Sequence, residues 1–151
     1  MIIEVHREVA APAERAWSLL VDWERQGEWM PATTVHRLAG PHEGVGVRLE
    51  AVTGFGPARV ADPMRVVDWE PPRRCVMRHE GRWLRGTGTF VVAPLGQDQC
   101  RVTWREDLDP GPLLRRVPGM PTLIARASHP FFALALRRFA SALARHRPGT
   151  H

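Results

Sequence analysis

The feature that most constrains the fold is a long amphipathic helix expected over residues 130–146. Four large apolar residues fall within about 60° of one another on a wheel of 3.6 residues per turn: Phe132, Leu136, Phe139 and Leu143. Arg137 and Arg138 lie on the opposite side. Such a helix, about 25 Å long, must bury its apolar stripe against a large surface. Pro130 either begins this helix or kinks a longer one that begins near Thr122.

An antiparallel sheet is expected to supply that surface. Residues 2–9 alternate well enough for a first strand. Five later segments alternate apolar and polar residues with period two, and clusters of Gly, Pro and Asp separate them: 45–51, 64–69, 75–80, 84–92 and 100–108. The inward face of segment 64–69 stays open, because either Val66 or Val67 can point to the core. No repeat or linker interrupts the pattern, so residues 1–151 are expected to form a single domain.

Two short helices are expected after the first strand. Pro12 suits a first helical turn, and apolar residues then recur at helical spacing through Leu20. Asp22 is placed to cap a second short helix, which Pro31 ends. The chain is therefore predicted to be an α+β protein whose sheet is covered by its long C-terminal helix.

Composition excludes several classes of protein. No apolar run approaches the roughly 20 residues that span a bilayer, and the N-terminus lacks a signal-peptide pattern, so a cytoplasmic location is expected. Cys75 and Cys100 form no metal motif, and a third strand between theirs keeps them too far apart for a disulfide. No metal and no cofactor are expected.

Charge is distributed unevenly along the chain. All 21 basic residues are Arg, which is typical of a GC-rich bacterial genome, and the formal net charge is +5. Residues 110–151 contain seven Arg and no acidic residue. This basic end either meets an anionic partner or forms a solvated helix face. No nucleic-acid-binding motif is present, so nucleic acid is not an expected partner.

The register of the expected hairpins places side chains on two faces. A two-residue turn at Gly81–Arg82 would put Met77 opposite Gly86. Aligning the next hairpin so that Val92 faces Cys100 would put Gly86 opposite Glu106. The inward face then carries apolar residues together with His79 and Glu106, whereas the arginines of these strands face solvent.

Gly86 and Gly88 are expected to leave a hollow beneath the C-terminal helix, because glycine in a strand interior often marks close approach by another group. His79 and Glu106 would lie beside this hollow, and ionisable groups in a cleft are candidate functional residues. The alternative is that the glycines accommodate sheet curvature, that Glu106 lies at the rim, and that His79 is a hydrogen-bonded core residue. The sequence leaves both interpretations open.

Three segments and the closing helix together resemble the SRPBCC superfamily of START-like and polyketide cyclase/dehydrase-like proteins. The segments are Ala11–Trp17, Trp69–Arg73 and Gly86–Phe90. The resemblance implies a helix-grip fold, in which a curved seven-stranded antiparallel sheet wraps around a long C-terminal helix. It also implies a cavity for lipids, polyketides, or sterol-like or aromatic compounds. Because the chain has no Tyr, a tyrosine-based mechanism is excluded.

Three functions remain open from the sequence. The first is binding of a hydrophobic small molecule, with walls and polar contacts from Met77, Arg82, Gly86, Gly88, Phe90, Trp104, His129, Phe132 and Leu136. The second is a cyclase/dehydrase-type enzyme with His79 or Glu106 as general base. The third is an interaction module that docks its basic C-terminal helix, through Arg115–Arg116 and residues 145–147, on an anionic partner or membrane. The sequence identifies neither the ligand nor the oligomeric state, monomer or homodimer.

Overall fold

The computed structural model describes residues 1–145 of the chain. Seven strands form one antiparallel sheet: β1 (Ile2–Val9), β2 (Thr33–Arg37), β3 (Arg48–Phe55), β4 (Ala58–Glu70), β5 (Arg74–Glu80), β6 (Leu84–Pro94) and β7 (Cys100–Pro110). Four helices accompany it: α1 (Ala13–Leu20), the 3-10 helix η1 (Trp23–Glu28), α2 (Pro112–Arg115) and α3 (Met120–Arg145). None of the helices in this part of the chain is long and apolar enough to cross a membrane.

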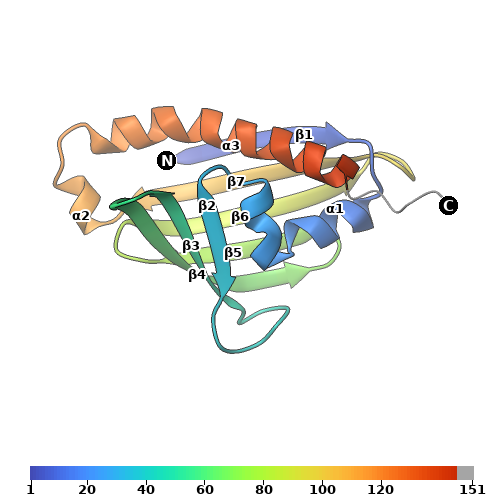
Figure 1. Cartoon of the computed structure of the whole chain (residues 1–151), viewed down its shortest axis with the longest axis horizontal. Coiled ribbons are helices and arrows are strands. Elements are labelled where there is room, and N and C mark those ends of the chain that lie inside the picture. Colours follow the sequence, from blue (N-terminus) through green and yellow to red (C-terminus); the bar gives the residue numbers. More distant parts are fainter. Residues whose placement is uncertain (146–151) are drawn as a thin grey trace.

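The strand order is β1-β7-β6-β5-β4-β3-β2, so the first two strands of the chain lie at opposite edges of the sheet. Strands β2 to β7 follow one another as a meander, and β7 then pairs with β1. Helices α1 and η1 carry the chain from one edge to the other across the face that α3 also covers (Figure 1). The sheet curls around these helices, which gives the predicted helix-grip architecture.

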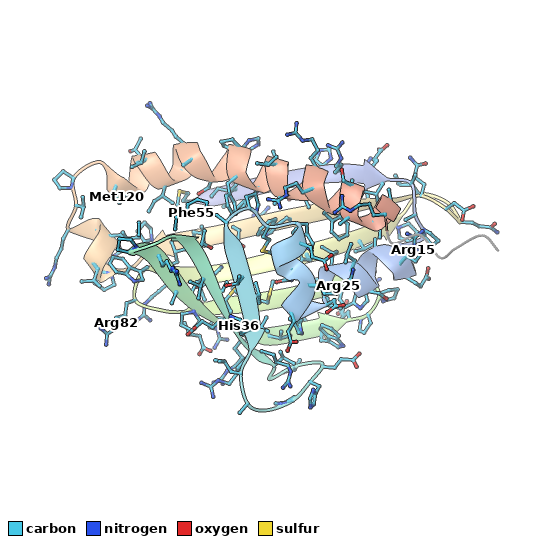
Figure 2. All side chains as sticks on the ribbon, in the orientation of Figure 1. Arg15, Arg25, His36, Phe55, Arg82 and Met120 are labelled. Carbon is cyan, nitrogen blue, oxygen red and sulfur yellow. The ribbon has the colours of Figure 1, made fainter. Side chains whose placement is uncertain are left out.

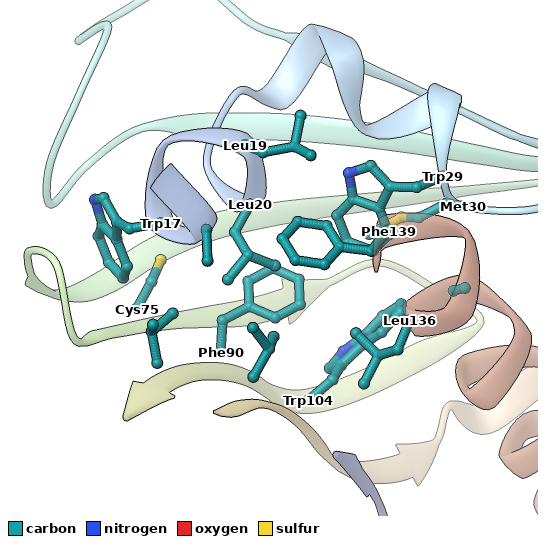
Figure 3. Packing of buried hydrophobic residues seen from close by; sticks show 14 of the residues in the cluster. Trp17, Leu19, Leu20, Trp29, Met30, Cys75, Phe90, Trp104, Leu136 and Phe139 are labelled. Carbon is teal, nitrogen blue, oxygen red and sulfur yellow. The ribbon is translucent and has the colours of Figure 1, made fainter. Parts of the chain in front are cut away.

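Helix α3 buries the predicted apolar stripe. Phe132, Leu136, Phe139 and Leu143 are all buried, and α3 packs along β1. Aromatic rings from helix and sheet meet in the core (Figure 3), where Trp29 lies edge-on to Phe90, Trp104 and Phe139. Burial of such rings is the main stabilising contribution to a core of this kind.

Pro130 lies inside α3, so the longer of the two predicted helices is the one that forms. The helix begins at Met120, two residues before the predicted start. Nearer the start of the chain, Asp22 occupies the N-cap position of η1, but its side chain makes no capping hydrogen bond.

Both hairpin registers differ from the prediction by two residues. Glu80 pairs with Arg85, so the β5–β6 loop has four residues instead of two, and Pro94 rather than Val92 pairs with Cys100. Tertiary contacts hold the β5–β6 loop open, because the backbone N–H of Gly111 donates to the carbonyl of Trp83. Since side chains alternate along a strand, a shift of two leaves the inward set unchanged.

A bulge in β4 settles which valine faces the core. The pairing with β5 shifts between Val66 and Asp68, and Val66 is fully buried whereas Val67 is half-buried. Arg65 consequently points outward, where it pairs with Glu80. On the N-terminal side of the bulge, Met64 and Asp62 share the inward face with Val66.

Candidate functional site

A cavity of about 550 Å³ lies between the inward face of the sheet and α3. Its sheet wall includes Met77, Phe90 and Trp104, and its helix wall includes Phe131 and Phe132. One end reaches the surface near α2, where the lining residue Trp83 is 40% exposed. The loops that follow β5 and β7 and the first turn of α3 surround this end (Figure 1).

A cluster of three ionisable side chains forms the polar part of the cavity wall. His79 on β5 lies at the centre, with its Nδ1 2.8 Å from Asp62 Oδ2 on β4 and its Nε2 2.8 Å from Glu106 Oε2 on β7. His79 and Glu106 are buried, and the Asp62 side chain is 18% exposed. The three strands thus place an acid, an imidazole and an acid in one line across the sheet.

Gly88 on β6 makes room for this arrangement. Gly88 pairs with Glu106, and a Cβ at Gly88 would lie 2.7 Å from Glu106 Oε1 and 2.9 Å from Oε2. The Glu106 side chain therefore crosses β6 over the glycine to reach His79 on the next strand. Any larger residue at this position would displace the carboxylate.

Trp104 fixes the second oxygen of Glu106. The indole Nε1–H donates to Glu106 Oε1 at 2.8 Å, while the indole ring stacks on Phe132 with ring centroids 4.2 Å apart. Both carboxylate oxygens of Glu106 thus accept hydrogen bonds from residues of the cavity wall. The position of Glu106 is defined from two sides.

The two carboxyl groups determine the charge of His79. Burial by itself lowers its pKa, but the hydrogen bonds and charges of Asp62 and Glu106 outweigh that effect and raise the pKa from 6.5 to about 10. A protonated imidazole has two N–H donors, which matches its two acceptors. His79 is therefore an imidazolium at neutral pH, with both protons held by neighbouring side chains.

Asp62 is a site residue that the sequence pattern does not predict. The strand expected from Met64 extends back to Ala58 in the structure, through Arg59, Asp62 and Pro63, which do not alternate with apolar residues. The usable signal was the spacing of Asp62, Met64 and Val66 at every second position. Asp62 Oδ1 is buried and has no hydrogen-bond partner.

The structure brings six of the predicted site residues to the cavity wall: His79, Glu106, Met77, Phe90, Trp104 and Phe132. Leu136 is 2% exposed and belongs to the packed core behind them. Arg82 and His129 are exposed and are not part of the wall; Arg82 lies on the surface near α2 (Figure 2). Their contact with a ligand stays a prediction.

The expectation that two glycines leave a hollow is wrong in its detail. Gly86 has φ of +112°, and a Cβ there would lie 2.0 Å from the Asp107 carbonyl oxygen, so glycine is required by the backbone. At Gly88 the space is filled by Glu106. Neither glycine is among the residues that line the cavity.

Cys75 and Cys100 are buried free cysteines. Within residues 1–145, no group of three or more His, Cys, Asp or Glu side chains is arranged to hold a metal ion. The ionisable groups on the cavity wall are Asp62, His79 and Glu106, which can form hydrogen bonds and exchange protons.

Residues 1–144 match the family model described as polyketide cyclase / dehydrase and lipid transport. A search of curated proteins finds no significant match.

Solved structures share the fold at low sequence identity. The protein TTHA0849 from Thermus thermophilus is 19% identical with a TM-score of 0.77, over 98% of this chain and 100% of that chain. Zhui aromatase/cyclase from Streptomyces sp. R1128 is 16% identical with a TM-score of 0.76, over 99% and 96%. A START superfamily protein from Mycobacterium smegmatis is 20% identical with a TM-score of 0.74, over 94% and 98%.

Proposed function

Because the chain belongs to the polyketide cyclase/dehydrase and lipid transport family of the SRPBCC superfamily, we propose that it binds a hydrophobic small molecule between the sheet and α3. The observation that carries the proposal is the cavity of about 550 Å³, whose walls are mainly apolar and whose polar groups converge in one buried cluster. Cavities of this size and character are typical of sites for compact organic ligands.

The aromatic walls favour a flat or extended apolar ligand. Phe90, Trp104, Phe131 and Phe132 line the cavity, and the Trp104 ring stacks on the Phe132 ring. Rings of this kind stabilise aromatic ligands by offset stacking and edge-to-face contacts in addition to burial of apolar area. Polyketide-derived aromatics and other polycyclic compounds suit such a site better than a small polar metabolite does.

A second candidate function, catalysis, is favoured by the buried cluster itself. Of the two general bases predicted from the sequence, His79 is protonated at neutral pH, and both Glu106 oxygens already accept hydrogen bonds. Asp62 is the member of the cluster whose Oδ1 is not engaged. A proton-transfer reaction of the cyclase/dehydrase kind would therefore use Asp62 as the base and the imidazolium of His79 to hold it in place.

The docking of a basic C-terminal helix on an anionic partner gains no such support. The apolar stripe of α3 is buried on the sheet, and Arg115 pairs with Asp109. Of the proposed contacts at the end of the helix, residues 146–147 lie outside the described part of the chain. Binding in the cavity accounts for more of the observed arrangement.

The direct test combines ligand recovery with thermal shift. The purified protein would be extracted into organic solvent for mass spectrometry and then screened against apolar aromatics. A ligand at 100 times its Kd stabilises the fold by about 2.7 kcal/mol, which corresponds to a rise in Tm of about 5–10 °C for a domain of this size. The proposal would be contradicted if the purified protein contained no extractable ligand and no screened compound raised its Tm.

A matched pair of variants locates the binding site. Ala127 and Ala133 are both exposed residues of α3, but only Ala127 also lines the cavity. Ala127→Trp should fill the cavity and abolish the ligand-dependent rise in Tm, and Ala133→Trp should preserve it. Equal responses of the two variants would place the ligand elsewhere on the protein.

A further inference from the structure

We propose that the cavity selects ligands that donate a hydrogen bond to Asp62 and carry no negative charge, so that phenols, alcohols and amines bind in preference to carboxylates of the same skeleton. The inference rests on the proposed function and names the ligand class for that same site. Three observations on the described residues lead to it: the charges around the cavity, the use of each polar atom in the cluster, and the state of Asp62.

The first observation is the absence of any available cation. The chain has 21 basic residues, yet none of the residues lining the cavity is an arginine. The one cation present is the imidazolium of His79, which lies between two carboxyl groups. A ligand carboxylate would have to be buried without a partner and beside two acids, and an unpaired buried charge is strongly unfavourable.

The second observation is that the cluster has no donor left to offer. Both ring nitrogens of His79 donate to carboxyl oxygens, and the indole N–H of Trp104 donates to Glu106. Elsewhere on the wall, the hydroxyl of Ser128 donates to the Ile124 carbonyl oxygen of its own helix. At the cluster, an anionic or purely accepting ligand group would therefore meet donors that the protein already uses.

The third observation is that one acceptor remains. Asp62 Oδ2 accepts from His79, whereas Oδ1 is buried without a partner. A buried acceptor without a donor is unfavourable, because it has lost its hydrogen bonds to water. The Asp62 side chain keeps 18% exposure, and the last torsion of an aspartate is soft, so a small rotation brings Oδ1 to a ligand while Oδ2 stays on His79. A ligand hydroxyl or N–H meets this need directly.

Asp62 is thus the specificity-determining residue, and Glu106, Trp104 and His79 act through it as positioning residues. The imidazolium holds Oδ2, which orients the carboxylate. Glu106 holds the imidazole from its other side, and Trp104 holds Glu106. Within the cluster, the chain of hydrogen bonds leaves one acceptor oxygen without a donor, and a few placed polar groups in an apolar cavity are what orient a ligand.

The test uses three probes with one ring skeleton at pH 7: 2-naphthol, 2-methylnaphthalene and 2-naphthoate, with Kd measured by calorimetry or fluorescence. The naphthol should bind about tenfold or more tightly than the methyl compound, which is the gain typical of a hydrogen bond to a charged acceptor. The naphthoate should bind more weakly than both. A naphthoate that binds as tightly as the naphthol would overturn the inference while leaving binding itself established.

Variants attribute the selectivity to one residue. Asp62→Asn removes the charge with little change in size, so the advantage of the naphthol over the naphthoate should fall at least tenfold. Asp68→Asn on the same strand removes an acid that pairs with Arg74 outside the cavity, and it should leave all three Kd values unchanged. Unaltered selectivity in a folded Asp62→Asn protein would refute the role of Asp62. If none of the three probes and none of the screened apolar aromatics binds the wild type, the proposed function fails together with this inference.

Discussion

The charged state of His79 predicts that the protein loses stability as the pH rises above neutrality. The folded protein holds the His79 proton up to its pKa of about 10, whereas an unfolded histidine releases it near 6.5. The stabilisation is therefore fully present below pH 6.5 and is lost as the pH rises toward 10. In this interval the folded state binds one more proton than the unfolded state, so the free energy of unfolding falls by about 1.4 kcal/mol per pH unit.

The useful window for this measurement is pH 7 to 8.5. Burial raises the pKa of the Cys75 thiol from 9.0 to about 12, so above pH 9 the unfolded thiolate adds a second loss of the same sign. From pH 7 to pH 8.5, His79 alone should lower the free energy of unfolding by about 2 kcal/mol. That is a large change for a domain of this size, whose whole stability is about 5–15 kcal/mol.

Urea denaturation at a series of pH values measures the free energy of unfolding. NMR of the histidine side-chain nitrogens of the folded protein measures the protonation state of His79. Nitrogen shifts of His79 should remain those of an imidazolium through pH 8.5. His36→Gln removes an exposed histidine on β2 and should leave the pH slope unchanged. A flat or rising stability between pH 7 and 8.5, or a neutral His79 ring at pH 8, would refute the reasoning about the cluster.

Three further substitutions test the backbone, the cluster and the core. Gly86→Ala should lower the free energy of unfolding by about 2 kcal/mol or more, because φ is +112° and the new Cβ would lie 2.0 Å from a carbonyl oxygen. As the control, Gly96→Ala should leave the free energy of unfolding in urea unchanged, because a Cβ there would have nothing within 4 Å. Gly88→Ala should displace the adjacent carboxylate and lower the histidine pKa measured by NMR. Leu136→Ala should lower the free energy of unfolding by about 2–5 kcal/mol in the same urea assay. Leu134 is 37% exposed, so Leu134→Ala should lower it by less than about 1 kcal/mol.

Most of the fold follows from two periodicities in the sequence. Alternation with period two defines which residues of β5, β6 and β7 face inward, and the stripe from Phe132 to Leu143 requires a helix that covers that face. The strand registers could not be obtained in the same way. Alternation is unchanged by a shift of two residues, and the length of the β5–β6 loop is determined by contacts of Gly81 and Trp83 with distant segments.

The candidate site was predictable in part. His79 and Glu106 were expected on one face, and their side chains meet at 2.8 Å. Asp62 was missed because its strand begins in a segment with polar residues and a proline, where local alternation is weak. The need for glycine at position 88 could not be predicted, because it arises from the path of the Glu106 side chain across β6.

The position of the cluster, more than its composition, argues for a role in recognition. Replacing a buried ionic group with well-packed apolar side chains is often neutral or stabilising, so such a group is weak evidence of a contribution to stability. Here Asp62, His79 and Glu106 lie on the cavity wall, while the centre of the core is aromatic. Two members of the cluster have every polar atom engaged, and the third has one acceptor without a donor. A purely structural cluster would gain stability by engaging that oxygen within the protein, whereas a binding site needs it open to the ligand.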